Sequence, residues 1–243
     1  MRNMKFTDLS WAAVLFYYRS SGDRKYCKIM SDKDLRDAMR SDPLSIPERD
    51  FEQRVILDYI NTSNYDILYK CHMSRNILDI LAENRITVNS LARVNILDCN
   101  LSDAIIVQDI MRLYEGLLGV EGLWATGASK ILHILNSDLF PPINQSIIDH
   151  FEIYSQQNSY VSWLRIVQKN GLDVVDDFRK TNDSEDVSDF LSRRLRYDKL
   201  CCRKSIVKYI DEYYRLTVED KLPVPPSWVP ENKSEQASLA LNN

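Results

Sequence analysis

The chain has 243 residues, of which 44% are hydrophobic and 27% are charged, so it is long enough to bury a large core and has the composition of a soluble globular protein. It contains no run of 18 apolar residues, and its first residues lack the apolar region of a secretory signal, so we expect an intracellular protein (cytoplasm or nucleoid) with no membrane partner. The net charge of −4 disfavours a surface that is basic overall, so a nucleic-acid partner would require a local positive patch.

The five cysteines are odd in number and scattered, and no C-x-x-C pair occurs. In an intracellular protein this pattern predicts free thiols rather than disulfides. The three histidines show no metal-ligand spacing with one another, so we expect neither a metal ion nor another cofactor.

Apolar residues recur at intervals of three and four in the first part of the chain, which predicts helices. The predicted ranges are 8–20, 31–40 behind a cap at Ser31-Asp32, a helix from Pro47 to about residue 60, and shorter helices near 65–70, 74–83 and 87–96. No stretch alternates long enough to predict a strand, so the fold class is all-α.

The second part of the chain repeats this pattern. The predicted helices are 106–117 with a cap at Ser102 or Asp103, 126–135 with Thr126 as cap, 147–154, 160–169 ended by Asn170-Gly171, 173–180, 186–196 and 202–216. From residue 221 four prolines precede a Ser- and Asn-rich end, which we expect to be irregular.

A glycine-rich turn separates two of these helices. Four of the six glycines, Gly122 and Gly127 among them, lie within the twelve residues 116–127. A glycine turn that opens a helix leaves backbone N–H groups free for an anion such as a phosphate, and Thr126, Ser129 and Lys130 would add to such a site. The alternative is a turn that only reverses the chain.

The sequence 122–128, GLWATGA, followed by an apolar helix, resembles the helix-hairpin-helix of the base-excision DNA glycosylases, whose hairpin reads roughly L-x-G-V-G-x-K-T-A. In that family a P-x-x-V-D-T-H segment with a catalytic Asp follows. With the hairpins aligned, Asn144 takes the place of that Asp, and Pro141-Pro142-Ile143 leads up to it. The resemblance covers about residues 113–151. The apolar helix and the Leu-Phe-Pro that follows it are also similar to divergent members of the superfamily.

The departures from the family pattern bear on activity. Trp124 replaces the second hairpin glycine, and Thr126 stands where the family has its lyase Lys, so the resemblance implies a monofunctional enzyme. Asn144 cannot act as the general base or carry negative charge. Three accounts of it are open: an Asn that orients water, a binding protein without activity, or an Asp replaced to trap substrate. Cys201-Cys202 does not match the family's iron–sulfur pattern.

The resemblance also implies which residues meet DNA. A basic run over 193–208 stands beside the hairpin, and its side chains are either a solvated helix face or phosphate contacts. The expected DNA-binding residues are Gly122, Trp124, Thr126, Gly127, Ser129, Lys130, Arg193 and Arg194. An extruded base needs rings to stack on and polar groups at its edge, for which we expect Trp124, Tyr114 and Gln145.

The family's two-lobed helical fold implies one lobe from residues 1–49 plus 160–220, a second from 50–159 that holds the hairpin, and an irregular tail at 221–243. The expected function is a monomeric DNA glycosylase-like protein that binds double-stranded DNA and hydrolyses the N-glycosidic bond of a damaged or modified base. The alternatives are a non-catalytic helix-hairpin-helix DNA-binding protein and an all-α protein-interaction scaffold. The sequence does not name the base.

Overall fold

A computed structural model describes residues 3–19, 22–63, 72–153, 159–182, 186–194 and 202–224. The fold class is all-α, and the described residues contain no strand. In chain order, the elements are α1 (Phe6–Arg19), α2 (Gly22–Ser31), α3 (Lys33–Ser41), η1 (Pro43–Ser45), α4 (Glu48–Phe51), η2 (Glu52–Leu57), η3 (Ile60–Ser63), α5 (Met73–Glu83), α6 (Arg85–Leu91), α7 (Ala104–Leu118), α8 (Trp124–Leu135), α9 (Gln145–His150), α10 (Ser159–Arg179), α11 (Val187–Arg194), α12 (Ile206–Tyr214) and η4 (Arg215–Glu219).

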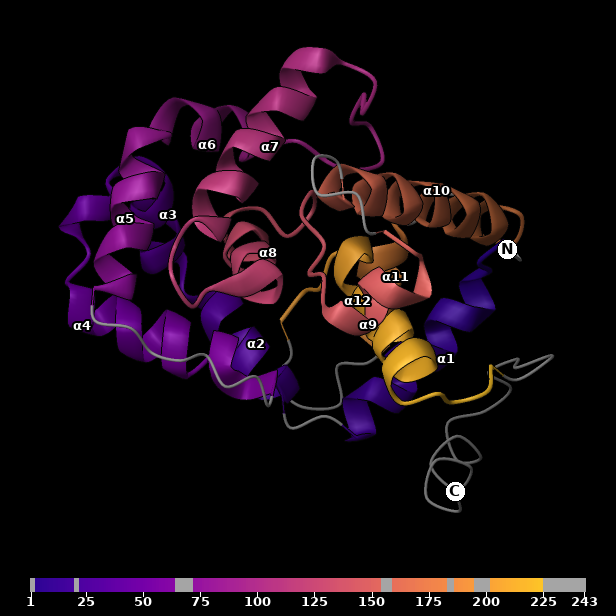
Figure 1. The fold of residues 1–243 in the computed structure, drawn as a ribbon. Helices are drawn as coiled ribbons and strands as arrows, with labels where there is room; N and C mark the ends of the chain where they lie inside the picture. The colour runs from indigo at the N-terminus through magenta and orange to yellow at the C-terminus, as the bar shows by residue number, and fades with distance from the viewer. Residues whose placement is uncertain are drawn as a thin grey trace.

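The helices lie in two groups in Figure 1, around a large main core and a smaller apolar cluster of Trp11, Ala12, Phe16 and Leu216. At one side, α1 packs against α10 and α12, so the two ends of the chain are joined there. At the other side, α7 packs against α5, α6 and α8, and α3 joins this group through α6 and α8. The division into two lobes at residues 49 and 160 stays a prediction, and α3, which precedes residue 49, packs with the middle helices.

Polar residues begin several helices as their sequence predicts. Asp32 caps α3 by accepting a hydrogen bond from the Leu35 N–H at 3.2 Å, and Asp103 caps α7 through the Ile105 N–H at 2.8 Å. Each bond satisfies one of the N–H groups that a helix leaves without a partner at its start. These two caps are confirmed.

Several helix predictions are wrong, and the helix predicted at 147–154 begins at Gln145 and ends at His150. α2 was not expected, because Ser20 to Asp23 signals the end of a helix. α8 begins at Trp124 rather than behind a Thr126 cap, and α6 ends at Leu91. α10 continues through Gly171, whose missing Cβ leaves room for Leu97: a Cβ there would lie 2.7 Å from Leu97 Cδ2. The helix predicted at 65–70 and the tail from 225 lie outside the described residues.

The described cysteines, Cys27, Cys99 and Cys202, are free thiols, as expected. None of the described helices is both long and apolar enough to cross a membrane.

Candidate functional site

The turn between α7 and α8 has the backbone of a tight hairpin. Gly122 has a φ of 87°, and Trp124, with a φ of 52°, also lies in the left-handed region that favours glycine. No side chain caps the start of α8, and the Trp124 side chain is 69% exposed. The cap residue Leu123 therefore satisfies none of the first N–H groups of α8 with its side chain, and the phosphate site stays a prediction.

The other hairpin residues turn inward. Gly127 lies within α8 and is buried, and a Cβ there would approach Leu123 Cδ1 to 2.7 Å, so this glycine serves helix packing and not the turn. Ser129 is fully buried, and its hydroxyl donates to the Thr126 carbonyl at 3.0 Å and accepts from the Ile143 N–H at 3.0 Å. Thr126 is half-buried and is not the N-cap.

Lys130 also points inward from α8. Its Nζ donates to the Ile60 carbonyl at 3.1 Å and lies 5.6 Å from the centre of the Tyr59 ring. Burial, together with Arg215, lowers the pKa of Lys130 to about 7. A lysine amine that is partly neutral near pH 7 can act as a base or nucleophile, which an ordinary surface lysine cannot.

The segment before Asn144 is fixed to α8 and α10 through its backbone. The Tyr160 hydroxyl donates to the Pro141 carbonyl at 3.0 Å, and the Trp163 indole donates to the Pro142 carbonyl at 2.9 Å. With the bond between the Ile143 N–H and Ser129, three successive residues are held by buried side chains. These three bonds fix the backbone that leads up to Asn144.

Asn144 opens α9. Its amide oxygen accepts from the Ile147 N–H at 3.0 Å, which makes it the helix cap, and its amide nitrogen donates to Oε1 of Glu219. The side chain is 9% exposed. Because both ends of the amide are bonded, Asn144 acts here to hold the Glu219 carboxylate.

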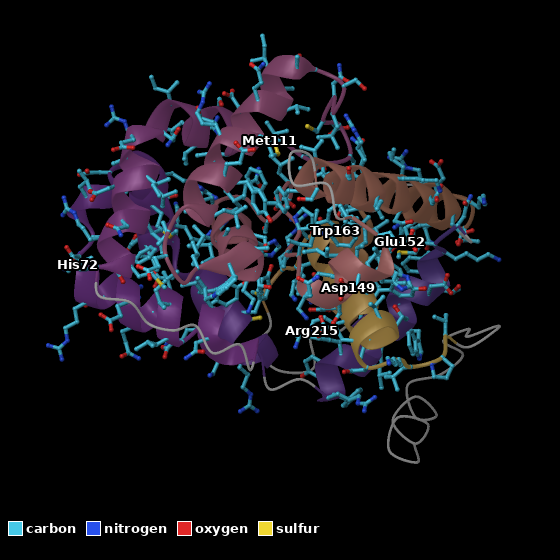
Figure 2. The ribbon with its side chains drawn as sticks, in the orientation of Figure 1. His72, Met111, Asp149, Glu152, Trp163 and Arg215 are labelled. Atoms are coloured by element: carbon cyan, nitrogen blue, oxygen red, sulfur yellow. The ribbon has the colours of Figure 1, made fainter. Side chains whose placement is uncertain are left out.

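Glu219 and Arg215 lie on η4, a π-helical turn that continues α12. The guanidinium Nε of Arg215 is 3.7 Å from the Glu219 carboxylate, and both side chains are partly exposed. Burial raises the pKa of Glu219, although Arg215 acts in the opposite direction. We call Lys130, Asn144, Arg215 and Glu219 the seam site, since α8 comes from one group of helices and η4 from the other; Arg215 lies near the centre of the view in Figure 2.

The basic run is divided between the core and the surface. Lys204 pairs with Glu212 at 2.9 Å and Lys208 with Asp211 at 2.6 Å, and all four side chains are at most 8% exposed. Burial raises the pKa of Asp211, but Lys208 and Arg215 outweigh it and hold the pKa below its ordinary value. Lys204 and Lys208 are therefore structural residues of the core. Neither of the two expectations for the basic run, a solvated helix face or phosphate contacts, describes them.

On the surface, Arg203 pairs with Asp186 and Asp189. Arg193 is exposed on α11, while the Arg194 side chain and residues 195–201 lie outside the described part of the chain.

The three residues expected to hold a base lie in different surroundings. Tyr114 is 3% exposed and stacks on Tyr160 with ring centres 4.3 Å apart, so its ring is already covered. Gln145 is exposed on α9 and donates to Asp149 at 2.7 Å. Trp124 is at the hairpin turn and is the one ring of the expected set that is free to stack.

Sequence reasoning missed Glu219 as the partner of Asn144, and Arg215 as the partner of Glu219. Glu219 is 75 residues away from Asn144, and only the packing of η4 against α9 brings them together.

Comparisons with protein-family models, curated proteins and solved structures found no match. Among the described residues, no three or more His, Cys, Asp or Glu side chains are grouped so that they could hold a metal ion.

Proposed function

We propose that this protein binds duplex DNA and hydrolyses the N-glycosidic bond of a modified base, with Glu219 as the carboxylate that Asn144 lacks. The observation that carries the proposal is the hydrogen bond between Asn144 and Glu219 at the head of α9. In glycoside hydrolysis a carboxylate stabilises the positive charge that develops on the sugar and activates the attacking water. Asn144 orients this carboxylate.

The neighbouring cations support the same role. Arg215 is partly exposed beside Glu219, so its guanidinium can meet a phosphate. Lys130, with its pKa of about 7, contributes less positive charge near the site than an ordinary lysine. The exposed Trp124 and the uncapped start of α8 supply a second contact with the duplex.

Incubation with DNA duplexes that carry varied modified bases, followed by detection of abasic sites, tests the proposal. Glu219→Gln keeps the shape and an oxygen for Asn144 but removes the charge, so we expect base release to fall about 10²–10⁴-fold with DNA affinity nearly unchanged. Glu48→Gln changes an exposed carboxylate near Arg75 and is the matched control, expected to be active. Equal activity of the Glu219→Gln variant and the wild type would exclude this role.

The burial of Asn144 favours a second candidate, a DNA-binding protein without catalysis. In that case no duplex releases a base, yet binding weakens with salt, and Arg215→Ala reduces the slope of log K against log salt by about 0.9 for the phosphate contact it loses. Asn144→Asp separates the candidates further, because it restores the carboxylate of the family pattern, and a gain of base release would favour catalysis over binding alone. Absence of DNA binding at low salt excludes both and leaves the scaffold.

A further inference from the structure

Two cysteines that lie far apart in the sequence meet beside α2. Cys27 is a residue of α2, and Cys202 lies a few residues before the start of α12. The backbone N–H of Cys202 donates to Sγ of Cys27 at 3.0 Å, across 175 residues of sequence. Both sulfurs are thiols. We call Cys27 and Cys202 the thiol pair.

This contact brings the second sulfur within reach of the first. The N and Cα atoms of one residue are about 1.46 Å apart, so Cα of Cys202 lies at most about 4.5 Å from Sγ of Cys27. In a disulfide the two Cα atoms are usually about 4.4–6.8 Å apart. Rotation of the Cys202 side chain about its Cα–Cβ bond can therefore bring its sulfur against that of Cys27 without a large movement of the backbone.

The hydroxyl of Tyr26 has both thiols as neighbours. Tyr26 precedes Cys27 on α2, is 3% exposed, and places its hydroxyl 3.3 Å from Nε2 of His133. Burial raises the pKa of Tyr26 well above its ordinary value, and the Cys202 and Cys27 sulfurs act in the same direction. A charge on either sulfur can disfavour the charged tyrosine only from a short distance, so both sulfurs face the same buried hydroxyl.

The backbone that follows Cys202 is anchored. The N–H of Lys204 donates to Oγ of Ser192 at 3.3 Å, and the Ser205 hydroxyl donates to the Ser137 carbonyl at 2.6 Å. Ser205 is also the cap of α12, where its hydroxyl accepts from the Lys208 N–H at 3.2 Å. These bonds fix the segment between Cys202 and α12, and so they hold the thiol pair together.

The thiols differ in exposure, which gives them different roles. Cys27 is 5% exposed, whereas Cys202 is half-buried and can meet a small oxidant. Cysteines that react with oxidants are accessible and often stand beside a second cysteine that completes the disulfide. Cys99 is the contrast, because it is 6% exposed and burial, together with Asp103, raises its pKa and leaves less of the reactive thiolate.

We propose that the thiol pair is a site of reversible oxidation by peroxides, which joins α2 to the start of α12 through a disulfide between Cys27 and Cys202. The Cys202 sulfur attacks one oxygen of hydrogen peroxide, the O–O bond breaks, and a sulfenic acid and one water form. The Cys27 sulfur then attacks the Cys202 sulfur, the S–O bond breaks, and a second water leaves as the S–S bond forms. Two thiols are oxidised, one peroxide is reduced, and both thiol protons leave in the waters.

The disulfide closes a loop of about 175 residues, and a link of this kind stabilises a fold mainly by restricting the unfolded chain. Its effect is also local, since α12 continues into η4, which carries Arg215 and Glu219. The inference does not rest on the proposed action on DNA, because the thiol pair and the seam site share no residue.

Treatment of the full chain with hydrogen peroxide, followed by alkylation of the remaining thiols, trypsin digestion and mass spectrometry, tests the inference. We expect a linked peptide pair that contains Cys27 and Cys202 and disappears on reduction with dithiothreitol. Cys201 is in the same tryptic peptide as Cys202, so Cys201→Ser is the matched control and should still form the link. Absence of the link, or a link that persists in Cys202→Ser, would overturn the proposal.

Thermal unfolding measures the consequence for the fold. We expect peroxide to raise the melting temperature of the wild type by about 5–10 °C, and dithiothreitol to reverse the rise. The rise should remain in Cys99→Ser and disappear in Cys27→Ser and Cys202→Ser. A melting temperature that stays constant or falls on oxidation of the wild type would also count against the proposal. If a buried variant does not fold, the linked peptide of the wild type and the half-buried Cys202→Ser decide the question.

Discussion

Lys130 and Asn144 each place a polar group in a buried position and give it a defined partner. Burial of a charge is unfavourable unless it is paired or neutralised, and Lys130 meets this condition with a carbonyl, a ring and a lowered pKa. The sequence carries a local signal for the helix cap at Asn144, because Asn is a favoured residue before an apolar helix. It could not predict the Glu219 partner, since that contact depends on packing between distant segments.

Lys130→Met should change how the free energy of unfolding depends on pH. The pKa of Lys130 is about 7 in the folded protein and near its ordinary value of 10.5 when unfolded. Between these values the unfolded state holds more protons, so this group makes the wild type more stable as pH rises, by at most about 1.4 kcal/mol per pH unit. Met has no proton to lose, and this rise disappears.

Urea unfolding of both proteins from pH 7 to pH 10 measures the effect as a widening difference in favour of the wild type. Lys169→Met is the control, because Lys169 is exposed and paired with Asp173, and its curve should run parallel to that of the wild type. A parallel curve for Lys130→Met as well would contradict the buried, partly neutral amine.

At the scale of elements, local signals determined most helices and long-range packing determined the exceptions. The caps of α3 and α7 follow from single Asp residues with the right spacing. Gly171 has the sequence signature of a helix end, yet α10 continues through it because the position faces Leu97 closely. The buried pairs of Lys204 and Lys208 show the same limit, since a basic run on a helix is usually solvated.

Gly127→Val should lower stability through the packing of α8. A side chain there is forced against Leu123, which is 1% exposed, and crowding of a packed core typically costs about 1–3 kcal/mol. Thr126→Val is the matched control, because it places the same residue one position earlier in the same helix at a half-buried site, and we expect it to be nearly neutral.

Thermal unfolding of the two variants, together with DNA binding at low salt, measures the outcome. Binding that is lost while the melting temperature is retained would return Gly127 to a role at the phosphate contact.

At the scale of the whole molecule, the two groups of helices meet along polar residues as well as apolar ones. His133 on α8 is fully buried, its Nδ1 lies 2.6 Å from the Phe140 carbonyl, and its Nε2 lies 3.3 Å from the Tyr26 hydroxyl. These partners fit a neutral ring that donates from Nδ1 and accepts at Nε2. The apolar pattern predicted an all-helical chain, but it could not predict this junction, because Tyr26 is 107 residues away from His133.

His133 should therefore set the acid limit of the fold. Burial lowers the pKa of His133 to about 4, whereas in the unfolded chain it is near its ordinary value of 6.5. Between pH 6.5 and pH 4 the unfolded state binds the extra proton, so stability falls as pH falls, by roughly 3 kcal/mol in all for this group.

His133→Gln is less stable at pH 7 through lost packing, but its stability should decline less on acidification. Urea unfolding at pH 7, 5.5 and 4.5 tests this, with the exposed His150→Gln as control. The difference between the wild type and His133→Gln should shrink with falling pH, while that for His150→Gln stays constant, and a constant difference for both would mean that His133 does not couple protonation to the folding of the whole molecule.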